Sequence, residues 1–277
     1  MGKLIFLDID GTMVNLQGIM PESTRTAMER ARENGHQICI CTGRTKGELY
    51  PFLLDMEIDG YICGAGCHVE WQGKEISSVA MSTELLVKLC RTFQENNIML
   101  LLQGTHYNYV LDEQKEQHDQ YMKELYEATG GQLYLPEPVI IHRWEEAEKI
   151  NMISYGCADI GSDEIETLLK SIAGDRGESL HLTPNSLNLE EEQSGEITVE
   201  GVHKAHGMQQ LMDLLGITRE DTIAFGDSMN DYEMIQFAGI GVAMGNATEK
   251  LKETADRVAP HIDEDGLYRE FKELGLI

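Results

Sequence analysis

Short apolar runs, each ending in a polar or glycine-containing turn and followed by an amphipathic stretch, recur near both ends of this 277-residue chain. Near the N-terminus, strands are expected at 4–8, 36–41 and 59–63, with helices at 21–35 and around 46–56. Near the C-terminus, strands are expected at 222–226 and 240–244, with helices at 208–215, 229–237 and 248–255. Strands that alternate with helices in this order predict a parallel sheet covered by helices. We therefore expect both ends to form one α/β core of the doubly wound, Rossmann-like kind.

The stretch between residues 82 and 191 has a different character. A helix is expected at 85–93, a strand at 98–102, a highly charged segment at 112–126, and strands at 150–157 and 180–189 around a helix at 163–172. We interpret this stretch as a smaller α/β domain inserted into the core. The expected domains are a core of residues 1-81 and 192-277 and an inserted domain of residues 82-191.

The charge balance limits the classes of partner. With 48 acidic and 22 basic side chains, the formal net charge is −26. Such a protein repels nucleic-acid backbones and anionic membrane surfaces, so neither is expected as a partner. A small anionic substrate remains possible, because a bound cation and a few positive groups can dominate a pocket. We find neither a secretory signal nor an apolar run long enough to span a bilayer, and we expect a cytoplasmic protein.

Six cysteines raise the question of a metal site or a disulfide. Cys63 and Cys67 are separated by three residues and followed by His68, which is a weak zinc pattern without a second pair at the usual spacing. We expect reduced, structural cysteines.

The first candidate chemical group is the carboxylate pair Asp8 and Asp10, directly after the first apolar strand. At a spacing of two, strand-like residues point the same way, and two adjacent carboxylates repel each other unless a proton or a cation intervenes. The carboxyl ends of parallel strands are also where ligands bind in open α/β sheets. A solvated acidic turn is the simpler alternative.

Two further candidates are individually weak. Thr42, Gly43 and Arg44 follow the second strand and precede a helix, where a hydroxyl and backbone N–H groups would suit a phosphate. An ordinary helix cap is the competing interpretation of Thr42. Lys204 stands at the start of the helix that leads to Leu215, and a surface lysine is the default interpretation there.

A third polar cluster, Gly226-Asp227-Ser228-Met229-Asn230-Asp231, ends the apolar strand at 222–226. Carboxylate and amide groups this close together suit a hard cation and its supporting residues. Asn230 or Asp231 alone could merely cap the following helix, but Asp227 directly after the strand is harder to explain in that way.

Taken in order, these four motifs make the chain similar to the haloacid dehalogenase-like superfamily. Within it, the chain resembles the Cof-type phosphatases, which carry a large α/β cap between the second and third motifs. The resemblance covers the whole length, including the run Glu200-Gly201-Val202-His203-Lys204. Two positions depart from the usual pattern: Cys63 stands where such proteins usually have Asn, and Ala205 where Gly is common.

The resemblance implies a mechanism and a set of site residues. Asp8 would attack the phosphorus and form an aspartyl-phosphate, while Asp10 would act as general acid and then as general base. Mg²⁺ would be held by the Asp8 carboxylate, the Asp10 backbone carbonyl and Asp227. The expected phosphate-binding residues are Thr42, Gly43, Lys204 and Asn230, and the expected supporting residues are Gly11, Arg44 and Asp231.

The predicted function is thus Mg²⁺-dependent hydrolysis of a small phosphorylated metabolite such as a sugar phosphate, a nucleotide or a cofactor phosphate. The alternatives are a phosphotransferase or phosphomutase on the same core, a receiver-like signalling protein, and a non-catalytic phosphate-binding protein. The physiological substrate is not readable from the residues. A monomer or a small homo-oligomer is expected.

Overall fold

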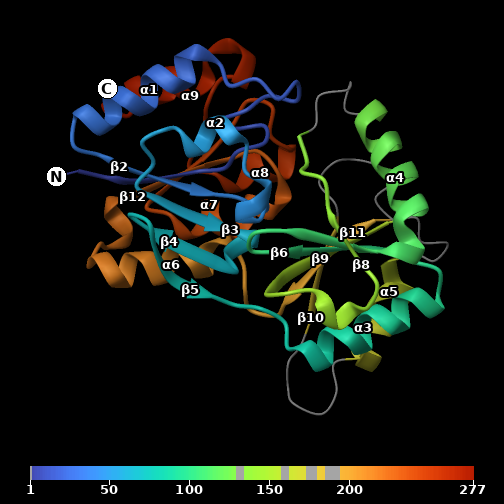
Figure 1. The fold of residues 1–277 in the computed structure, drawn as a ribbon. Coiled ribbons are helices and arrows are strands. Elements are labelled where there is room, and N and C mark those ends of the chain that lie inside the picture. The colour runs from blue at the N-terminus through green and yellow to red at the C-terminus, as the bar shows by residue number, and fades with distance from the viewer. Residues whose placement is uncertain (1, 129–133, 157–161, 173–179, 185–193) are drawn as a thin grey trace. The chain divides into compact units, whose positions relative to one another are not determined.

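The protein, seen in a computed structural model, is described for residues 2–128, 134–156, 162–172, 180–184 and 194–277 (Figure 1). It divides into two compact units. The first unit comprises Met1–Gly43, Leu49–Ser77 and His203–Ile277, and the second comprises Arg44–Glu48 and Ser78–Val202. The chain therefore leaves the first unit twice, once for a short segment and once for its long middle stretch. The roles of catalytic core and cap for these units stay a prediction.

The first unit is built on one mixed sheet. Its described strands lie in the order β14-β13-β12-β1-β2-β3-β4-β5. Their bounds are β1 (Leu4–Leu7), β2 (Gln37–Cys41), β3 (Gly60–Cys63), β4 (His68–Trp71), β5 (Lys74–Ser78), β12 (Thr222–Gly226), β13 (Ile240–Ala243) and β14 (Arg257–Val258). Pairing is parallel from β14 through β3, and β4 is antiparallel to β3. Strand β1 lies between β2 and β12, so both ends of the chain meet in the middle of the sheet, and the predicted α/β class with a parallel-sheet core is confirmed.

Helices cover both faces of this sheet. They are α1 (Glu22–Glu33), α2 (Pro51–Leu54), α6 (Lys204–Leu215), α7 (Tyr232–Phe237), α8 (Glu249–Thr254) and α9 (Gly266–Glu273). Short 3₁₀ turns are η2 (Gly64–Gly66), η5 (Arg219–Asp221), η6 (Met229–Asp231) and η7 (Ile262–Glu264). Helices α1 and α9 lie side by side on one face, and α6 lies on the other (Figure 1). Across the described ranges, no helix has the length and apolar character required to cross a bilayer.

The central strands are continuously apolar because both of their faces are buried. Every residue of β1 is fully buried. Leu4 and Phe6 pack in one cluster with Met208 of α6, together with residues of α7 and α8. On β12, the Phe225 ring packs against Phe271 of α9, with ring centroids 5.2 Å apart. The polar residues that follow these strands are therefore displayed at the edge of a rigid, close-packed layer.

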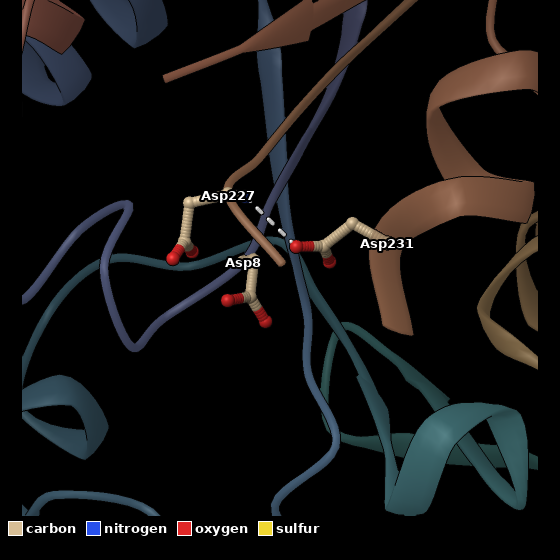
Figure 2. A group of neighbouring side chains, drawn as sticks. All are labelled: Asp8, Asp227 and Asp231. Atoms are coloured by element: carbon tan, nitrogen blue, oxygen red, sulfur yellow. Dashed lines mark hydrogen bonds between the residues drawn. The ribbon is translucent and has the colours of Figure 1, made fainter. Parts of the chain in front are cut away.

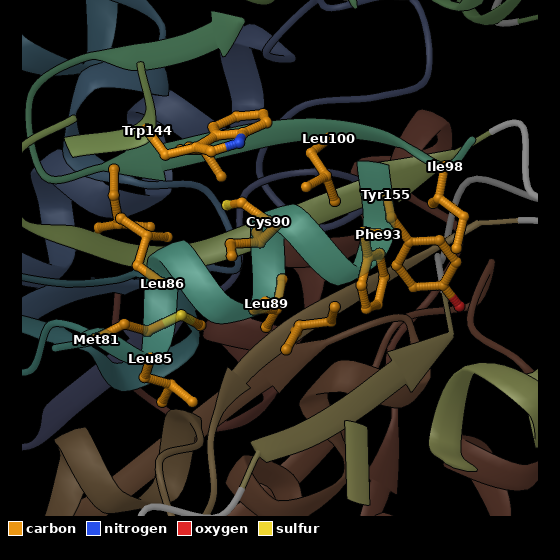
Figure 3. Packing of buried hydrophobic residues seen from close by; sticks show 14 of the residues in the cluster. Met81, Leu85, Leu86, Leu89, Cys90, Phe93, Ile98, Leu100, Trp144 and Tyr155 are labelled. Atoms are coloured by element: carbon orange, nitrogen blue, oxygen red, sulfur yellow. The ribbon is translucent and has the colours of Figure 1, made fainter. Parts of the chain in front are cut away.

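The second unit has its own sheet and core. Its described strands lie in the order β10-β11-β9-β6-β7-β8, and their bounds are β6 (Met99–Gly104), β7 (Asn108–Leu111), β8 (Val139–Ile141), β9 (Ile150–Gly156), β10 (Leu180–Pro184) and β11 (Gly195–Val199). The pairs are antiparallel except for β7 and β8. The helices are α3 (Thr83–Glu95), α4 (Lys115–Ala128) and α5 (Ser162–Ile172), and the 3₁₀ turns are η1 (Lys46–Glu48), η3 (Asp112–Gln114) and η4 (Trp144–Glu146). Figure 3 shows α3 turning Leu86, Leu89 and Phe93 into this core.

The structure differs from two local expectations. The helix expected around residues 46–56 is broken into η1 and the short α2, because Pro51 has no N–H to donate and so begins a new helix. The charged stretch at 112–126, to which no element was assigned, forms η3 and most of α4. Part of the strand expected at 180–189 lies outside the described residues.

Candidate active site

Lys204 and Asp8 form the centre of the candidate site, in the first unit. Asp8 directly follows β1 and is 4% exposed, and Lys204 is the first residue of α6 and is 1% exposed. The Lys204 Nζ atom donates to Asp8 Oδ1 at 2.6 Å and to Asp231 Oδ1 at 2.5 Å. Although burial lowers the pKa of Lys204, the charges of Asp231 and Asp8 more than offset it and raise the pKa above its ordinary value. Lys204 is therefore a buried ammonium and not the surface lysine that is the default for this residue type.

Asp231 is held in place by the loop after β12. Its Oδ2 atom accepts hydrogen bonds from the backbone N–H groups of Asp227, at 2.9 Å, and of Ser228, at 3.0 Å. A Cβ atom on Gly226 would lie 2.5 Å from the Asp231 carboxyl carbon, so glycine is required for this close approach. With Oδ1 bonded to Lys204, both Asp231 oxygens are occupied. Asp231 therefore orients Lys204 and the Asp227 loop.

Asp8, Asp227 and Asp231 bring three carboxylates together, with one oxygen of each within 4.8 Å of the others (Figure 2). Burial and the nearby Asp231 raise the pKa of Asp8 to about 7, although Lys204 opposes them. Burial, Asp231 and Asp8 raise the pKa of Asp227 well above its usual range. When all three carboxylates are ionised, they and the one ammonium leave an excess of two negative charges, which together with burial is the cause of the raised pKa values of Asp8 and Asp227. This donor set fits a divalent cation bound by oxygen ligands, with Asp8 and Asp227 as the carboxylates available to it.

The loop after Asp8 packs directly on Asp227. Gly11 has φ +86°, and a Cβ atom there would lie 2.2 Å from Asp227 Oδ2. Thr12 Oγ1 donates to Asp227 Oδ1 at 3.2 Å, and Asn246 Nδ2 donates to the Gly11 carbonyl at 2.7 Å. Gly11 is thus required both for its backbone conformation and for the contact with the acidic group. Sequence reasoning gave Thr12, in the segment after Asp8 and Asp10, no role of its own, and it missed Asn246, which only the tertiary fold brings to this loop.

Asp10 is half-buried and has a partner that the sequence did not suggest. The Tyr50 hydroxyl donates to Asp10 Oδ1 at 3.2 Å, and Tyr50 is 6% exposed. Tyr50 directly precedes α2, in a segment expected to be one helix, and it belongs to no motif that we recognised. The contact fixes one oxygen of the Asp10 carboxyl group.

Thr42, Gly43 and Asn230 line another side of the first-unit site. Thr42 follows β2, is 1% exposed and is held by backbone hydrogen bonds: its N–H donates to Ile62 O at 2.8 Å, and its carbonyl accepts from Ala65 N at 3.1 Å. A Cβ atom on Gly43 would lie 3.3 Å from Asn230 Nδ2. Asn230 Oδ1 accepts from Lys204 Nζ at 3.4 Å and from Ser228 Oγ at 2.8 Å. The structure thus brings these predicted phosphate-binding residues together with Lys204, whereas Arg44 belongs to the second unit.

The turn after β3 supports the start of α6. Residues 64–66 all have positive φ, and a Cβ atom on Gly66 would lie 2.3 Å from the His203 carbonyl. Cys63 ends β3, and Ala205 follows Lys204 in α6; both departures from the usual pattern are buried. The five described cysteines are buried and form no disulfide, and Cys157 lies outside the described residues. The acidic group above is the one metal-type cluster in the described ranges.

Comparison with known proteins agrees with this geometry. A family profile described as haloacid dehalogenase-like hydrolase matches residues 5–271. YkrA of Bacillus subtilis (strain 168), a proposed phosphatase, is 30% identical over 277 residues, covering 99% of this chain and 98% of its own. The 5-amino-6-(5-phospho-D-ribitylamino)uracil phosphatase YitU of the same organism is 29% identical, covering 98% of this chain and 96% of its own. The solved structure of BT4131, described as a subclass IIB sugar phosphatase of the superfamily, aligns with a TM-score of 0.82 at 28% identity, covering 99% of this chain and 100% of its own.

The chain belongs to the haloacid dehalogenase-like hydrolase family. The resemblance to this superfamily and its Cof-type members is therefore confirmed, and so is the expectation of an enzyme.

Proposed function

We propose that the protein is a Mg²⁺-dependent phosphatase that hydrolyses monoesters of small phosphorylated metabolites through an aspartyl-phosphate intermediate. The observation that carries this proposal is the buried group in which Lys204 joins Asp8 to Asp231 beside Asp227. Two relatives that span nearly the whole chain support the substrate class, since one is named for a phosphorylated ribitylaminouracil and the other is described as a sugar phosphatase.

Asp8 is the proposed nucleophile. One of its carboxylate oxygens forms a bond to phosphorus while the ester oxygen leaves with its electron pair, which splits hydrolysis into two steps. Lys204 Nζ, 2.6 Å from Asp8 Oδ1, offsets the repulsion between an anionic carboxylate and an anionic phosphate. Two like unit charges about 4 Å apart repel by roughly 4 kcal/mol at an effective dielectric near 20. Offsetting this repulsion therefore lowers the activation barrier substantially.

Asp10 is the proposed general acid and base. It gives a proton to the departing oxygen in the first step and takes one from water in the second, which regenerates its protonated form. The Tyr50 hydroxyl donates to Asp10 Oδ1 at 3.2 Å, which orients the carboxyl group for proton transfer. Tyr50 is thus proposed to orient the group that moves the proton.

Mg²⁺ is the proposed cofactor, with the Asp8 carboxylate, the Asp10 backbone carbonyl and Asp227 as its protein ligands. When bound, the ion neutralises negative charge on the phosphoryl oxygens and on the acidic group. Asp231 is proposed to support this site through the Asp227 backbone and not as a ligand, because its Oδ2 accepts two backbone N–H bonds and its Oδ1 is bonded to the Lys204 ammonium.

The phosphoryl oxygens are proposed to be bound by the Thr42 hydroxyl, the Gly43 backbone N–H, Lys204 and Asn230. A Cβ atom on Gly43 would lie 3.3 Å from Asn230 Nδ2, so the two residues are neighbours, and Asn230 Oδ1 accepts from Lys204. The Thr42 backbone is held by Ile62 and Ala65, and Lys204 is held by Asp8 and Asp231, so these donors need little rearrangement to stabilise the transition-state charge.

The proposal is tested by phosphate release from an aryl phosphate and from a panel of sugar, nucleotide and ribitylamino phosphates, with Mg²⁺ and with chelator. Turnover that requires Mg²⁺ and falls by about four orders of magnitude or more in Asp8→Asn would support it. Transfer of the phosphoryl group to an added sugar acceptor in preference to water would replace it with the phosphotransferase alternative. A folded, Mg²⁺-binding protein that releases no phosphate from any compound would refute it.

A further inference from the structure

The segment Arg44–Glu48 belongs to the second unit although its neighbours on both sides belong to the first. Gly47 N donates to the carbonyl of Thr105, in the turn between β6 and β7, at 3.0 Å. A Cβ atom on Gly47 would lie 2.4 Å from the His106 carbonyl, so this segment packs against the β6–β7 turn without room for a side chain. Arg44 Nη1 donates to the Tyr134 carbonyl at 2.8 Å. The five residues directly after Thr42-Gly43 therefore pack as part of the second unit.

Glu48 is the side chain that holds this segment. It is 1% exposed, and its Oε1 atom accepts from Gln103 Nε2 and from Asn108 Nδ2, each at 2.8 Å. Its Oε2 atom accepts from the Thr45 backbone N–H at 2.8 Å and from Thr45 Oγ1 at 3.1 Å. Ser154 Oγ donates to Gln103 Oε1 at 2.7 Å, which turns the Gln103 amide nitrogen toward Glu48. A carboxylate can accept all four bonds, whereas a carboxamide would place an NH₂ group against other donors.

At both of its ends, this segment is flanked closely in the chain by residues with a proposed role in phosphate binding or proton transfer. Thr42 and Gly43 lie just before it, and Tyr50, which donates to Asp10 Oδ1, lies two residues after Glu48. Lys46–Glu48 form a short 3₁₀ turn. Only Leu49 separates Glu48 from Tyr50, and on the other side Glu48 holds Thr45 by two hydrogen bonds, so a displacement of Glu48 is passed along the backbone toward Tyr50 and toward Thr42.

We propose that Glu48 is a positioning residue through which the second unit sets the Thr42 loop and the Tyr50–Asp10 contact. It touches no reacting atom and acts through the residues on either side. The inference rests on the proposed phosphatase function, because only there do Thr42 and Asp10 have their roles. It makes the second unit a determinant of the catalytic rate in addition to any selection of the substrate.

The first test is hydrogen–deuterium exchange, which does not depend on turnover. Glu48→Gln is compared with Gln114→Met, a matched control: Gln114 is also buried in the second unit, and its amide bonds to the backbone at Leu100 and Ile98. Faster exchange in Glu48→Gln across the whole of residues 42–50, but not in the control, is the expected result. Faster exchange confined to residues 44–48 would overturn the proposal even if the enzyme is an active phosphatase.

The second test is kinetic, with an aryl phosphate at saturating Mg²⁺. Glu48→Gln should lower kcat by about 3- to 30-fold, and Gln114→Met by less than about twofold at a comparable loss of melting temperature. In a Tyr50→Phe background the effect of Glu48→Gln should shrink, because both substitutions disturb the same Asp10 contact. Equal losses in Glu48→Gln and in the control, or full additivity with Tyr50→Phe, would show that Glu48 only stabilises the second unit. If the wild-type protein releases no phosphate, the proposed function fails, and the exchange result still decides whether the segment moves as one.

Discussion

Each unit of this protein contains a buried acidic centre, and the two centres are satisfied in opposite ways. In the first unit, Asp8 and Asp231 pair with one ammonium, Lys204, and Asp227 lies beside them, so the group has an excess of negative charge when all three carboxylates are ionised. In the second unit, the carboxylate of Glu48 accepts hydrogen bonds from neutral amide and hydroxyl donors. The first arrangement is a donor set that fits a divalent cation. The second saturates the Glu48 carboxylate with hydrogen bonds to its neighbours. Burial alone therefore does not distinguish a reactive acid from a positioning one; the sum of nearby charges does.

The largest expected effect is on Lys204. Lys204→Met would leave Asp8 and Asp231 buried without their counter-charge, and breaking such a group by removing one partner costs about 3–5 kcal/mol of unfolding free energy. Urea unfolding measures this loss, and phosphate release should fall by about three orders of magnitude or more. Glu48→Gln, which removes a charge that has no ionic partner among the described residues, should cost less. Equal losses in the two variants would remove the distinction drawn between the centres.

A second prediction separates close approach from backbone strain. Gly11 and Gly35 have nearly the same positive φ, +86° and +85°, but a Cβ on Gly11 meets Asp227, while a Cβ on Gly35 has nothing within 4 Å. Gly11→Ala should weaken Mg²⁺ binding, measured by calorimetry, by about tenfold or more, since the Asp227 carboxylate must move. Gly35→Ala should cost only about 1 kcal/mol of stability and leave Mg²⁺ affinity unchanged. Equal Mg²⁺ affinity in both variants would contradict Asp227 as a ligand.

A third prediction concerns pH and Mg²⁺. The pKa of Asp8 rises from 3.8 to about 7 in the folded protein, so without a cation its protonated form stabilises the fold most below about pH 4, and this contribution is lost as the pH rises through about 7. A bound cation favours the ionised carboxylate, so the gain in melting temperature on adding Mg²⁺ should be larger near pH 8 than near pH 5. Scanning calorimetry at both pH values measures the gain. Glu48→Gln should keep the same difference, whereas Asp227→Asn should abolish it.

The smallest expected effect is that of Tyr50→Phe. Losing one hydrogen bond to the Asp10 carboxylate should lower kcat by about 3- to 10-fold, leave KM nearly unchanged and alter the pH–rate profile, because Asp10 would be less well oriented for proton transfer. Steady-state kinetics across a pH series measures all three quantities. Tyr61→Phe serves as a matched control, because the Tyr61 hydroxyl donates to the Leu53 carbonyl at 3.5 Å. A change in KM without a change in kcat would place Tyr50 in substrate binding instead.

The sequence by itself determined the architecture of the first unit and the catalytic candidates placed on it. Apolar runs that end in Asp8, Thr42 and Asp227 predict parallel strands whose polar ends meet at one edge, because such strands are buried on both faces and must expose their chemistry where they stop. Hydrophobic periodicity is a local property, so β1, β2 and β12 could be placed from it. The order of the motifs along the chain then identified the family.

Only the tertiary structure decided which neutral and distant residues complete the site. Tyr50 and Asn246 belong to no short pattern, and their contacts depend on segments that fold back onto Asp10 and Gly11. Thr12 lies next to the first motif, but its contact with Asp227 joins residues that are far apart in the chain. The burial of Lys204 and the assignment of Glu48 to the second unit depend in the same way on how far-apart segments pack. A single charged or hydroxyl side chain leaves no repeating pattern in the sequence from which its partner could be predicted. Whether it is solvated, reactive or fixed is set by the atoms that surround it in space.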